Sequence, residues 1–159
     1  MTSKSNGVVL WTGPSRIDEA PIVAIATALR RESKNAKTGR MIQTWIIRRD
    51  MHPYEAINSG ADVSVCGNCP HRRQEDGSRS CYVGAYVLGS IYRAYVSESY
   101  RHCHSFADIA SISEGKMVRI GSYGDPGAVP FAIWEALTSK STGHTGYTHL
   151  WDSPVYDPR

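Results

Sequence analysis

Short apolar runs alternate with polar, glycine-containing segments along most of the chain, and each run predicts one element of secondary structure. The run from Pro21 to Ala28 is apolar and partly β-branched, which is typical of a buried strand. A second strand is expected over Met41–Ile47, and the turn-rich stretch Ser33–Gly39 between the two runs indicates a hairpin-like pair with a long loop. Residues 1–19 mix glycine, proline and polar residues, so we expect an irregular lead-in there.

Helices are expected after this strand pair. Pro53 suits the first turn of a short helix over Tyr54–Asn58, which Gly60 would end. Apolar residues then recur at near-helical spacing from Val83 to Tyr100 and predict a longer helix. A shorter helix is expected over Phe106–Ile112.

The second half of the chain has the order of a parallel unit. A strand over Met117–Ile120 leads into the glycine-rich segment Gly121–Gly127, a helix over Val129–Leu137 and a last strand over Tyr147–Trp151. We therefore expect one α/β domain over residues 1–159. It would combine an N-terminal strand pair, a cysteine-rich metal loop and a partial parallel sheet with helices, of the kind that a barrel fragment forms.

The composition is that of an ordinary globular protein, with 41% hydrophobic and 21% charged residues. No run approaches the ~20 apolar residues of a membrane span, and the start of the chain lacks the pattern of a secretory signal. We therefore expect a cytoplasmic protein without a membrane partner. In a reducing cytoplasm, the four cysteines indicate metal or redox chemistry rather than structural disulfides.

The net charge of +3 is too small to identify a partner, but its distribution is uneven. Positive side chains cluster between positions 30 and 49, where Glu32 alone opposes them: Arg30, Arg31, Lys34, Lys37, Arg40, Arg48 and Arg49. Such a basic stretch could contact nucleic acid or an acidic partner. A solvated hairpin surface is the plainer explanation.

The motif Cys66-Gly-Asn-Cys69-Pro70 is the most specific feature of the chain. A C-x-x-C turn brings two thiolates within reach of one metal, and Cys81 adds a third. Zinc sites usually pair two short ligand spacings, so three clustered thiolates fit an iron–sulfur cluster at least as well. We therefore expect Cys66, Cys69 and Cys81 to hold a 4Fe–4S cluster in preference to a 3Fe–4S cluster. Zinc is the alternative.

The fourth ligand stays open at this point. Cys103 is the first choice, because it offers the soft thiolate that both metals accept, although a lone cysteine is more often a small buried apolar residue. The other candidates are His71, His102 and His104. A thioredoxin-like use of the C-x-x-C pair is disfavoured, because the residues after Cys69 are polar and turn-like rather than helical. Reduced cysteines without a metal are the remaining alternative.

Several segments together resemble a family of uncharacterised proteins encoded by bacteriophages and other mobile elements. They are Ser33-Lys-Asn-Ala-Lys-Thr-Gly39, Met41-Ile-Gln-Thr-Trp45, Gly60-Ala-Asp62, Cys66-Gly-Asn-Cys-Pro-His-Arg72, Cys81-Tyr-Val83, Ile91-Tyr-Arg-Ala-Tyr95, Gly121-Ser-Tyr-Gly-Asp-Pro126 and Gly146-Tyr-Thr-His149. The resemblance implies a phage protein that acts in the host-cell cytoplasm. The family pattern includes counterparts of Cys66, Cys69 and Cys81 but not of Cys103. Its members are commonly longer, which implies that this chain is a short or truncated member.

More remotely, a cysteine loop followed by a helix and a strand ending in Gly-Asp is similar to radical S-adenosylmethionine enzymes. Those enzymes hold a four-iron cluster with three cysteines and bind S-adenosylmethionine at the open iron. The resemblance implies a cluster with one open iron for redox, radical or ligand-binding chemistry. This sequence departs from that pattern, because eleven residues separate its second and third cysteines and the chain is too short for a full barrel.

The glycine-rich segment is a second candidate site. Backbone N–H groups around Gly121, Gly124 and Asp125 could cradle the phosphate or carboxylate of a cofactor, and a plain turn capped by Asp125 explains the same residues. His149 could act as an acid–base group, although a structural histidine is the simpler reading.

Two other functions stay open beside the iron–sulfur protein. The first is a zinc-stabilised binding module that contacts nucleic acid or a host protein through the basic stretch. The second is an interaction protein whose cysteines are incidental. No motif decides whether the chain is an enzyme.

Overall fold

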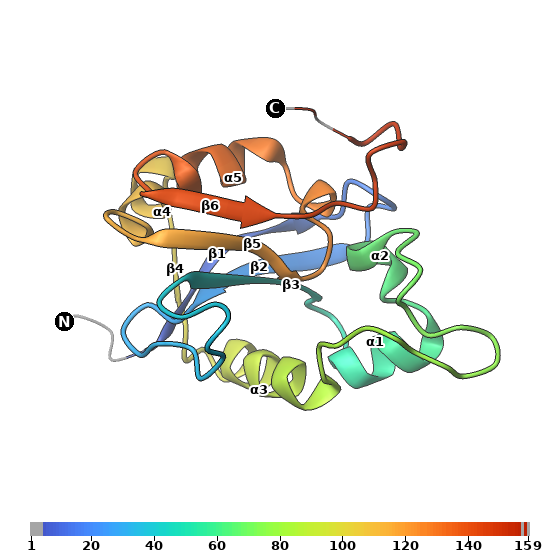
Figure 1. Cartoon of the computed structure of the whole chain (residues 1–159). Helices are drawn as coiled ribbons and strands as arrows, with labels where there is room; N and C mark the ends of the chain where they lie inside the picture. The colour runs from blue at the N-terminus through green and yellow to red at the C-terminus, as the bar shows by residue number, and fades with distance from the viewer. Residues whose placement is uncertain (1–4, 157, 159) are drawn as a thin grey trace.

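The computed structural model describes residues 5–156 and residue 158, which form one mixed sheet flanked by helices (Figure 1). The strands are β1 (Gly7–Pro14), β2 (Pro21–Thr27), β3 (Ile42–Arg48), β4 (Arg101–His102), β5 (Met117–Tyr123) and β6 (Gly143–Gly146). The helices are α1 (Pro53–Ser59), α2 (Val63–Cys66), α3 (Ala85–Val96), α4 (Phe106–Ile112), the 3₁₀ turn η1 (Pro126–Ala128) and α5 (Phe131–Thr138).

The sheet has the strand order β4-β1-β2-β3-β5-β6. β2 is antiparallel to both of its neighbours, whereas β1 pairs with β4, and β3 pairs with β5 and β5 with β6, in parallel. The carboxyl ends of β1, β3, β5 and β6 therefore lie at one edge of the sheet, where ligands of open α/β sheets bind. The expected α/β class is confirmed. The described strands form an open sheet, not a closed barrel.

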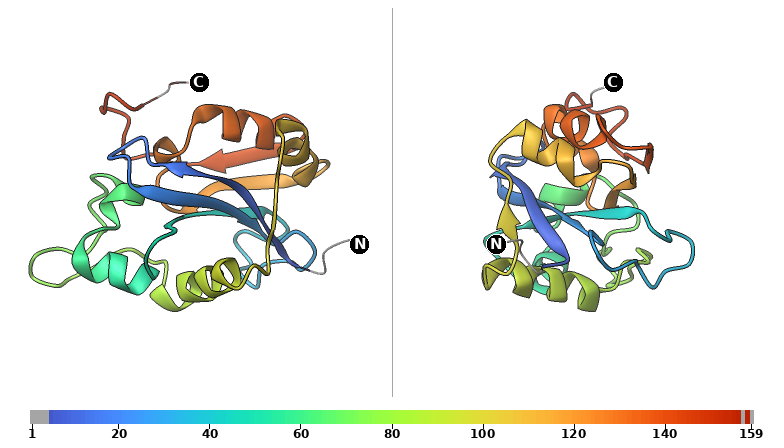
Figure 2. Two further views of the ribbon diagram at one scale, coloured as in Figure 1. Left: turned by 180° about the vertical axis from the view of Figure 1, so that it is seen from behind. Right: turned by 90° about the vertical axis from the view of Figure 1, so that its left-hand side faces the viewer.

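Helices cover both faces of this sheet. α1 and α3 lie on one face, and α4 and α5 lie on the other (Figures 1 and 2). The central strands β2 and β3 are buried on both sides, which explains their near-continuous apolar runs. Their apolar side chains with no exposed surface are Ile22, Val23, Ala24, Ile25, Ala26, Ile42 and Ile46. None of the helices in the described part of the chain has the length and apolar character of a membrane span.

Several expected elements are confirmed. β2 and β3 form the antiparallel pair predicted from their apolar runs. α1 begins at Pro53 and is followed by Gly60 in the left-handed conformation, with φ of 79°. α4 spans the expected Phe106–Ile112 and is capped by Ser105, whose Oγ accepts a hydrogen bond from the backbone of Asp108. The order β5, α5, β6 forms the predicted parallel unit.

Other expectations were wrong. The lead-in expected to be irregular contains β1, whose buried residues Val8, Val9 and Leu10 pack in the core. The last strand is β6 at Gly143–Gly146, not 147–151, because a polar edge strand lacks the apolar signal that the prediction used. The cysteine segment expected to be loop includes the short helix α2, and the helix expected over 83–100 is the shorter α3.

Candidate metal centre

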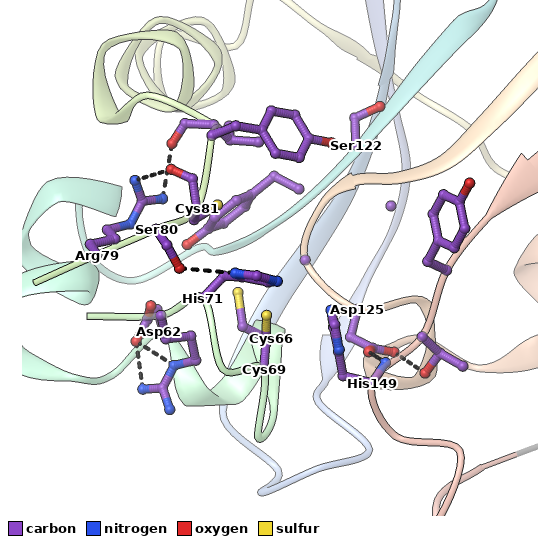
Figure 3. A pocket seen from close by; sticks show the side chains of 18 of the residues that line it. Asp62, Cys66, Cys69, His71, Arg79, Ser80, Cys81, Ser122, Asp125 and His149 are labelled. Carbon is purple, nitrogen blue, oxygen red and sulfur yellow. Dashed lines mark hydrogen bonds and ion pairs between the residues drawn. The ribbon is translucent and has the colours of Figure 1, made fainter. Parts of the chain in front are cut away.

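A cavity of about 390 Å³ lies at the carboxyl edge of β5, and three of the four cysteines line it. These are Cys66, Cys69 and Cys81, the residues expected to share a metal. In Figure 3 the sulfur atoms of Cys66 and Cys69 point into the same space, opposite Asp125 and His149. The volume falls within the roughly 300–1,000 Å³ of small-ligand sites. The loop after α2, the end of β5 and the segment after β6 therefore meet at one site.

The C-x-x-C turn follows directly from α2. Cys66 is the last residue of that helix, and the backbone N–H of Cys69 donates to the Cys66 carbonyl at 3.3 Å. Gly67 between them has a positive φ of 59°, and a β-carbon there would lie 2.6 Å from Cδ2 of Leu150. Only glycine fits both requirements, so the turn that brings the first two thiols together depends on it.

One buried ion pair holds the segment that carries Cys66. The side chain of Asp62 is only 3% exposed, and Arg72 Nη2 lies 2.6 Å from its Oδ1. Arg72 Nε also donates to Oδ1 at 3.0 Å. The same guanidinium reaches the carbonyls of Gly60 at 2.8 Å and Gly67 at 3.3 Å. A single arginine therefore ties together both ends of the segment around α2.

The third cysteine returns to the same place although eleven residues separate it from the second. The backbone N–H of Cys81 donates to the carbonyl of His71 at 3.0 Å. The loop between them is closed by a bond from the Gln74 N–H to the Ser78 carbonyl at 2.8 Å. His71 Nδ1 lies 2.9 Å from Ser80 Oγ, which adds a side-chain link beside the backbone one.

The electrostatics at Cys66 oppose a bare thiolate. Burial raises the pKa of the Cys66 thiol to about 12, the charge of Asp62 acts in the same direction, and a hydrogen bond with Tyr123 opposes them. Burial also raises the pKa of the Tyr123 phenol. A thiolate at Cys66 is therefore stable only beside a compensating positive charge, and a metal ion deprotonates the thiols that coordinate it.

The donor set fits a soft metal centre, because three thiols open onto one space. Within residues 5–156 and 158, however, no group of three or more Cys, His, Asp or Glu side chains stands in the geometry of a metal site closed around an ion.

The fourth-ligand candidates separate clearly. His71 lines the cavity, and its ring lies 6.0 Å, centroid to centroid, from that of His149. His102 belongs to β4, and Cys103 and His104 follow it. β4 and β6 are the two outermost strands of the sheet, so four strands separate β4 from β6. Cys103 is half-buried against the core, and its N–H donates to a carbonyl of β1. None of these three lines the cavity.

The glycine-rich candidates line the cavity, and two of their three backbone N–H groups donate hydrogen bonds within the chain. Gly121 and Gly124 are in the left-handed region, with φ of 69° and 85°. The Gly121 N–H donates to Thr44 Oγ1 at 2.8 Å, and the Asp125 N–H donates to the Val65 carbonyl at 2.6 Å. These two N–H groups stabilise the turn, and a phosphate or carboxylate cradle at this segment stays a prediction.

Asp125 fixes the segment after β6 above the cavity. Its side chain is buried, and Oδ1 accepts hydrogen bonds from the Gly127 N–H at 2.8 Å and from Thr148 Oγ1 at 2.7 Å. Oδ2 accepts from the His149 N–H at 2.6 Å. The aspartate is thus the turn cap that its sequence context allowed, and it also holds the backbone that carries His149 (Figure 3).

Several lining residues were not assigned a role from the sequence: Arg72, Arg79, Tyr123, Arg119 and Thr148. Arg72 lies three residues after the C-x-x-C pair and Asp62 four residues before it, and these opposite charges on either side of the motif are the signal that could have linked them. The other contacts join segments that are distant in the chain. Comparison with known protein families, curated proteins and solved structures finds no match for this chain.

Proposed function

We propose that this chain is a phage-type iron–sulfur protein in which Cys66, Cys69 and Cys81 hold a 4Fe–4S cluster. The main support is that these three thiols line one cavity, while the fourth thiol, Cys103, follows β4, the outermost strand at the other end of the sheet. Thiolates are the ligands of such clusters. The donors that the cavity offers therefore match that cofactor.

The spacing of the three cysteines along the chain favours a cluster over a single ion, because zinc sites usually pair two short ligand spacings. Thiolates around one zinc lie roughly 4 Å apart, because each Zn–S bond is about 2.3 Å long and the site is tetrahedral. A cluster places its own iron and sulfide between the ligands, so its thiolates stand farther apart. The three thiols that line the cavity would have this wider separation in the proposed protein.

Three protein ligands would leave one iron of the cluster without a protein thiolate. His71, His149 and Arg119 also line the cavity. An open iron would serve radical or ligand-binding chemistry, and a redox role needs none. S-adenosylmethionine is the ligand that the remote resemblance to radical enzymes suggests. The parallel strands β3, β5 and β6, with the cysteine loop directly after β3 and α1, are consistent with this relationship.

A zinc-stabilised module is the second candidate, and His71 favours it. Nδ1 of His71 is already bonded to Ser80, which leaves Nε2 as the ligand atom, the arrangement that zinc-bound histidines adopt. Three cysteines and His71 would complete a four-ligand site. In that function the basic stretch of residues 30–49 would contact nucleic acid or a host protein.

Anaerobic purification separates the two candidates. After reconstitution with iron and sulfide, we expect broad visible absorption and about four iron and four sulfide per chain. A colourless protein with one tightly bound zinc and no sulfide would favour the module instead. Failure to take up either metal under both conditions would contradict both functions.

A further inference from the structure

We propose that the same cavity binds a small molecule carrying a carboxylate or phosphate group, through Arg79 and Arg119. The inference goes beyond the metal centre and does not depend on it, because neither arginine is a candidate metal ligand. It rests on the charges that line the cavity, on an unpartnered buried donor and on two exposed aromatic rings at the cavity.

The first step concerns the positive charges. Three arginines line the cavity, and Arg72 is paired with the buried carboxylate of Asp62. The other carboxylate, Asp125, accepts its hydrogen bonds from a hydroxyl and two backbone N–H groups. Among the described residues, Arg79 and Arg119 have no carboxylate within ion-pair distance. Two guanidinium charges therefore line the cavity without an acidic partner.

Arg79 is held in place by neutral groups. Its Nη1 donates to the carbonyl of Cys81 at 3.2 Å, and its Nη2 donates to the carbonyl of Val83 at 2.9 Å (Figure 3). Its Nε is buried and has no hydrogen-bond partner. Buried donors in proteins are almost always satisfied, so this guanidinium is held with incomplete hydrogen bonding and without a counter-charge. An anionic group in the cavity supplies that counter-charge.

Arg119 approaches the same segment from β5. Its guanidinium donates to the hydroxyl of Tyr82 and lies 5.8 Å from the centroid of that ring. Tyr82 lies between the two residues whose carbonyls hold Arg79, so both guanidiniums contact one short stretch of chain. Guanidinium groups bind carboxylates and phosphates through paired, charge-assisted hydrogen bonds. The pair is therefore suited to one shared anionic group.

Two exposed tyrosines at the cavity indicate the chemistry of the rest of the ligand. Tyr82 and Tyr147 both line the cavity and are 75% and 80% exposed. Exposed tyrosine rings at a binding site offer flat apolar surfaces for stacking. We therefore expect the anionic group to be attached to a flat ring, as in a nucleoside monophosphate or an aromatic carboxylic acid.

The test titrates the full-length protein with adenosine monophosphate and, separately, with benzoate, by isothermal titration calorimetry. Arg119→Gln should weaken binding of the preferred probe by about tenfold or more, since charge-assisted hydrogen bonds are lost. The affinity of Arg119→Lys for the same probe should lie between those of Arg119→Gln and the native protein. Arg73→Gln is the control, because Arg73 belongs to the loop that carries Arg79 but is exposed and bonds Asn58 instead. That variant should bind as the native protein does.

The two probes distinguish a phosphate ligand from a carboxylate ligand. Equal affinity of the native and Arg119→Gln proteins, or no saturable binding of either probe at millimolar concentration, would overturn the proposal. Should Arg119→Gln fail to fold, binding by the native protein must weaken as NaCl is raised, and salt-independent binding would overturn the proposal equally.

A protein with Cys66, Cys69 and Cys81 all replaced by serine separates this site from the metal. Binding retained there with metal lost supports both proposals, and binding to a native protein that takes up no metal contradicts only the metal centre.

Discussion

Arg72 holds the buried carboxylate of Asp62 through two nitrogen atoms, Nε at 3.0 Å and Nη2 at 2.6 Å. The same side chain bonds two backbone carbonyls on either side of α2. A buried carboxylate without its partner is strongly destabilising. The pair therefore determines the shape of the loop from which the first thiol enters the cavity.

Arg72→Met should lower the free energy of unfolding by about 3–5 kcal/mol, because it leaves the Asp62 carboxylate buried and unpaired. Urea unfolding followed by circular dichroism measures the loss. Arg73→Met, on the neighbouring exposed arginine, should change stability by no more than about 0.5 kcal/mol. Adding Asp62→Asn to Arg72→Met should recover part of the loss, since the amide carries no charge. Equal stability of the two single arginine variants would contradict the role given to Arg72.

Three of the four single cysteine variants should lose bound metal, and the fourth should keep it. Replacing Cys66, Cys69 or Cys81 singly by alanine should reduce iron and sulfide bound per chain, because each removes one thiolate from the cavity. Cys103→Ala should keep the native metal content, since Cys103 lies at the other edge of the sheet. Metal and sulfide assays after anaerobic reconstitution measure the outcome. A large loss of metal in Cys103→Ala would show that the ligand set is wrong.

Gly67→Ala should destabilise the protein by about 1–3 kcal/mol, because the position combines positive φ with a 2.6 Å approach to Leu150. Gly84→Ala is the matched control: a β-carbon there meets no atom within 4 Å. Thermal unfolding of both variants provides the comparison. A larger loss in Gly84→Ala than in Gly67→Ala would contradict this account of the turn.

Acid stability should depend on the pair of Arg48 and Asp50. The hydrogen bonds from the Arg48 guanidinium, at 2.7 and 2.9 Å, lower the pKa of the Asp50 carboxyl. A carboxyl whose pKa is lower in the folded state stabilises the protein above its unfolded pKa of about 3.9, and this contribution is lost as the pH falls through the folded value.

The native protein should therefore be more stable than Asp50→Asn at pH 6, and the difference should shrink progressively below about pH 4. Urea midpoints of both proteins between neutral and acid pH measure it. Because the pair is partly exposed, added salt should reduce the difference at pH 6. A difference that grows on acidification would have the wrong sign.

The strands show which parts of the fold were accessible from the sequence. β2 and β3 are central, so both faces must be apolar and their runs are visible in the sequence. β6 is a polar edge strand bounded by Gly143 and Gly146, and it is a strand only because it pairs with β5. That pairing depends on the tertiary structure, and no local sequence pattern predicts it.

The same distinction holds for the site. The C-x-x-C spacing of Cys66 and Cys69 is local, so it could be predicted from two positions. The contact between Tyr82 and Arg119 joins residues 37 positions apart and exists because β5 lies beside the segment of the third cysteine. Arginines that line a cavity look no different in sequence from arginines in water, so their role follows only from the tertiary structure.

The bond between Cys81 and His71 also affects how far this site can vary among proteins. That backbone hydrogen bond brings the chain back to the cavity. The exposed stretch from Arg73 to Ser78 is therefore a loop whose length does not set the position of the third sulfur. Insertions or deletions at its tip would change the interval between the cysteines and leave the donor atoms where they are. A motif written with a fixed interval at that point would therefore exclude proteins that carry the same arrangement of thiols.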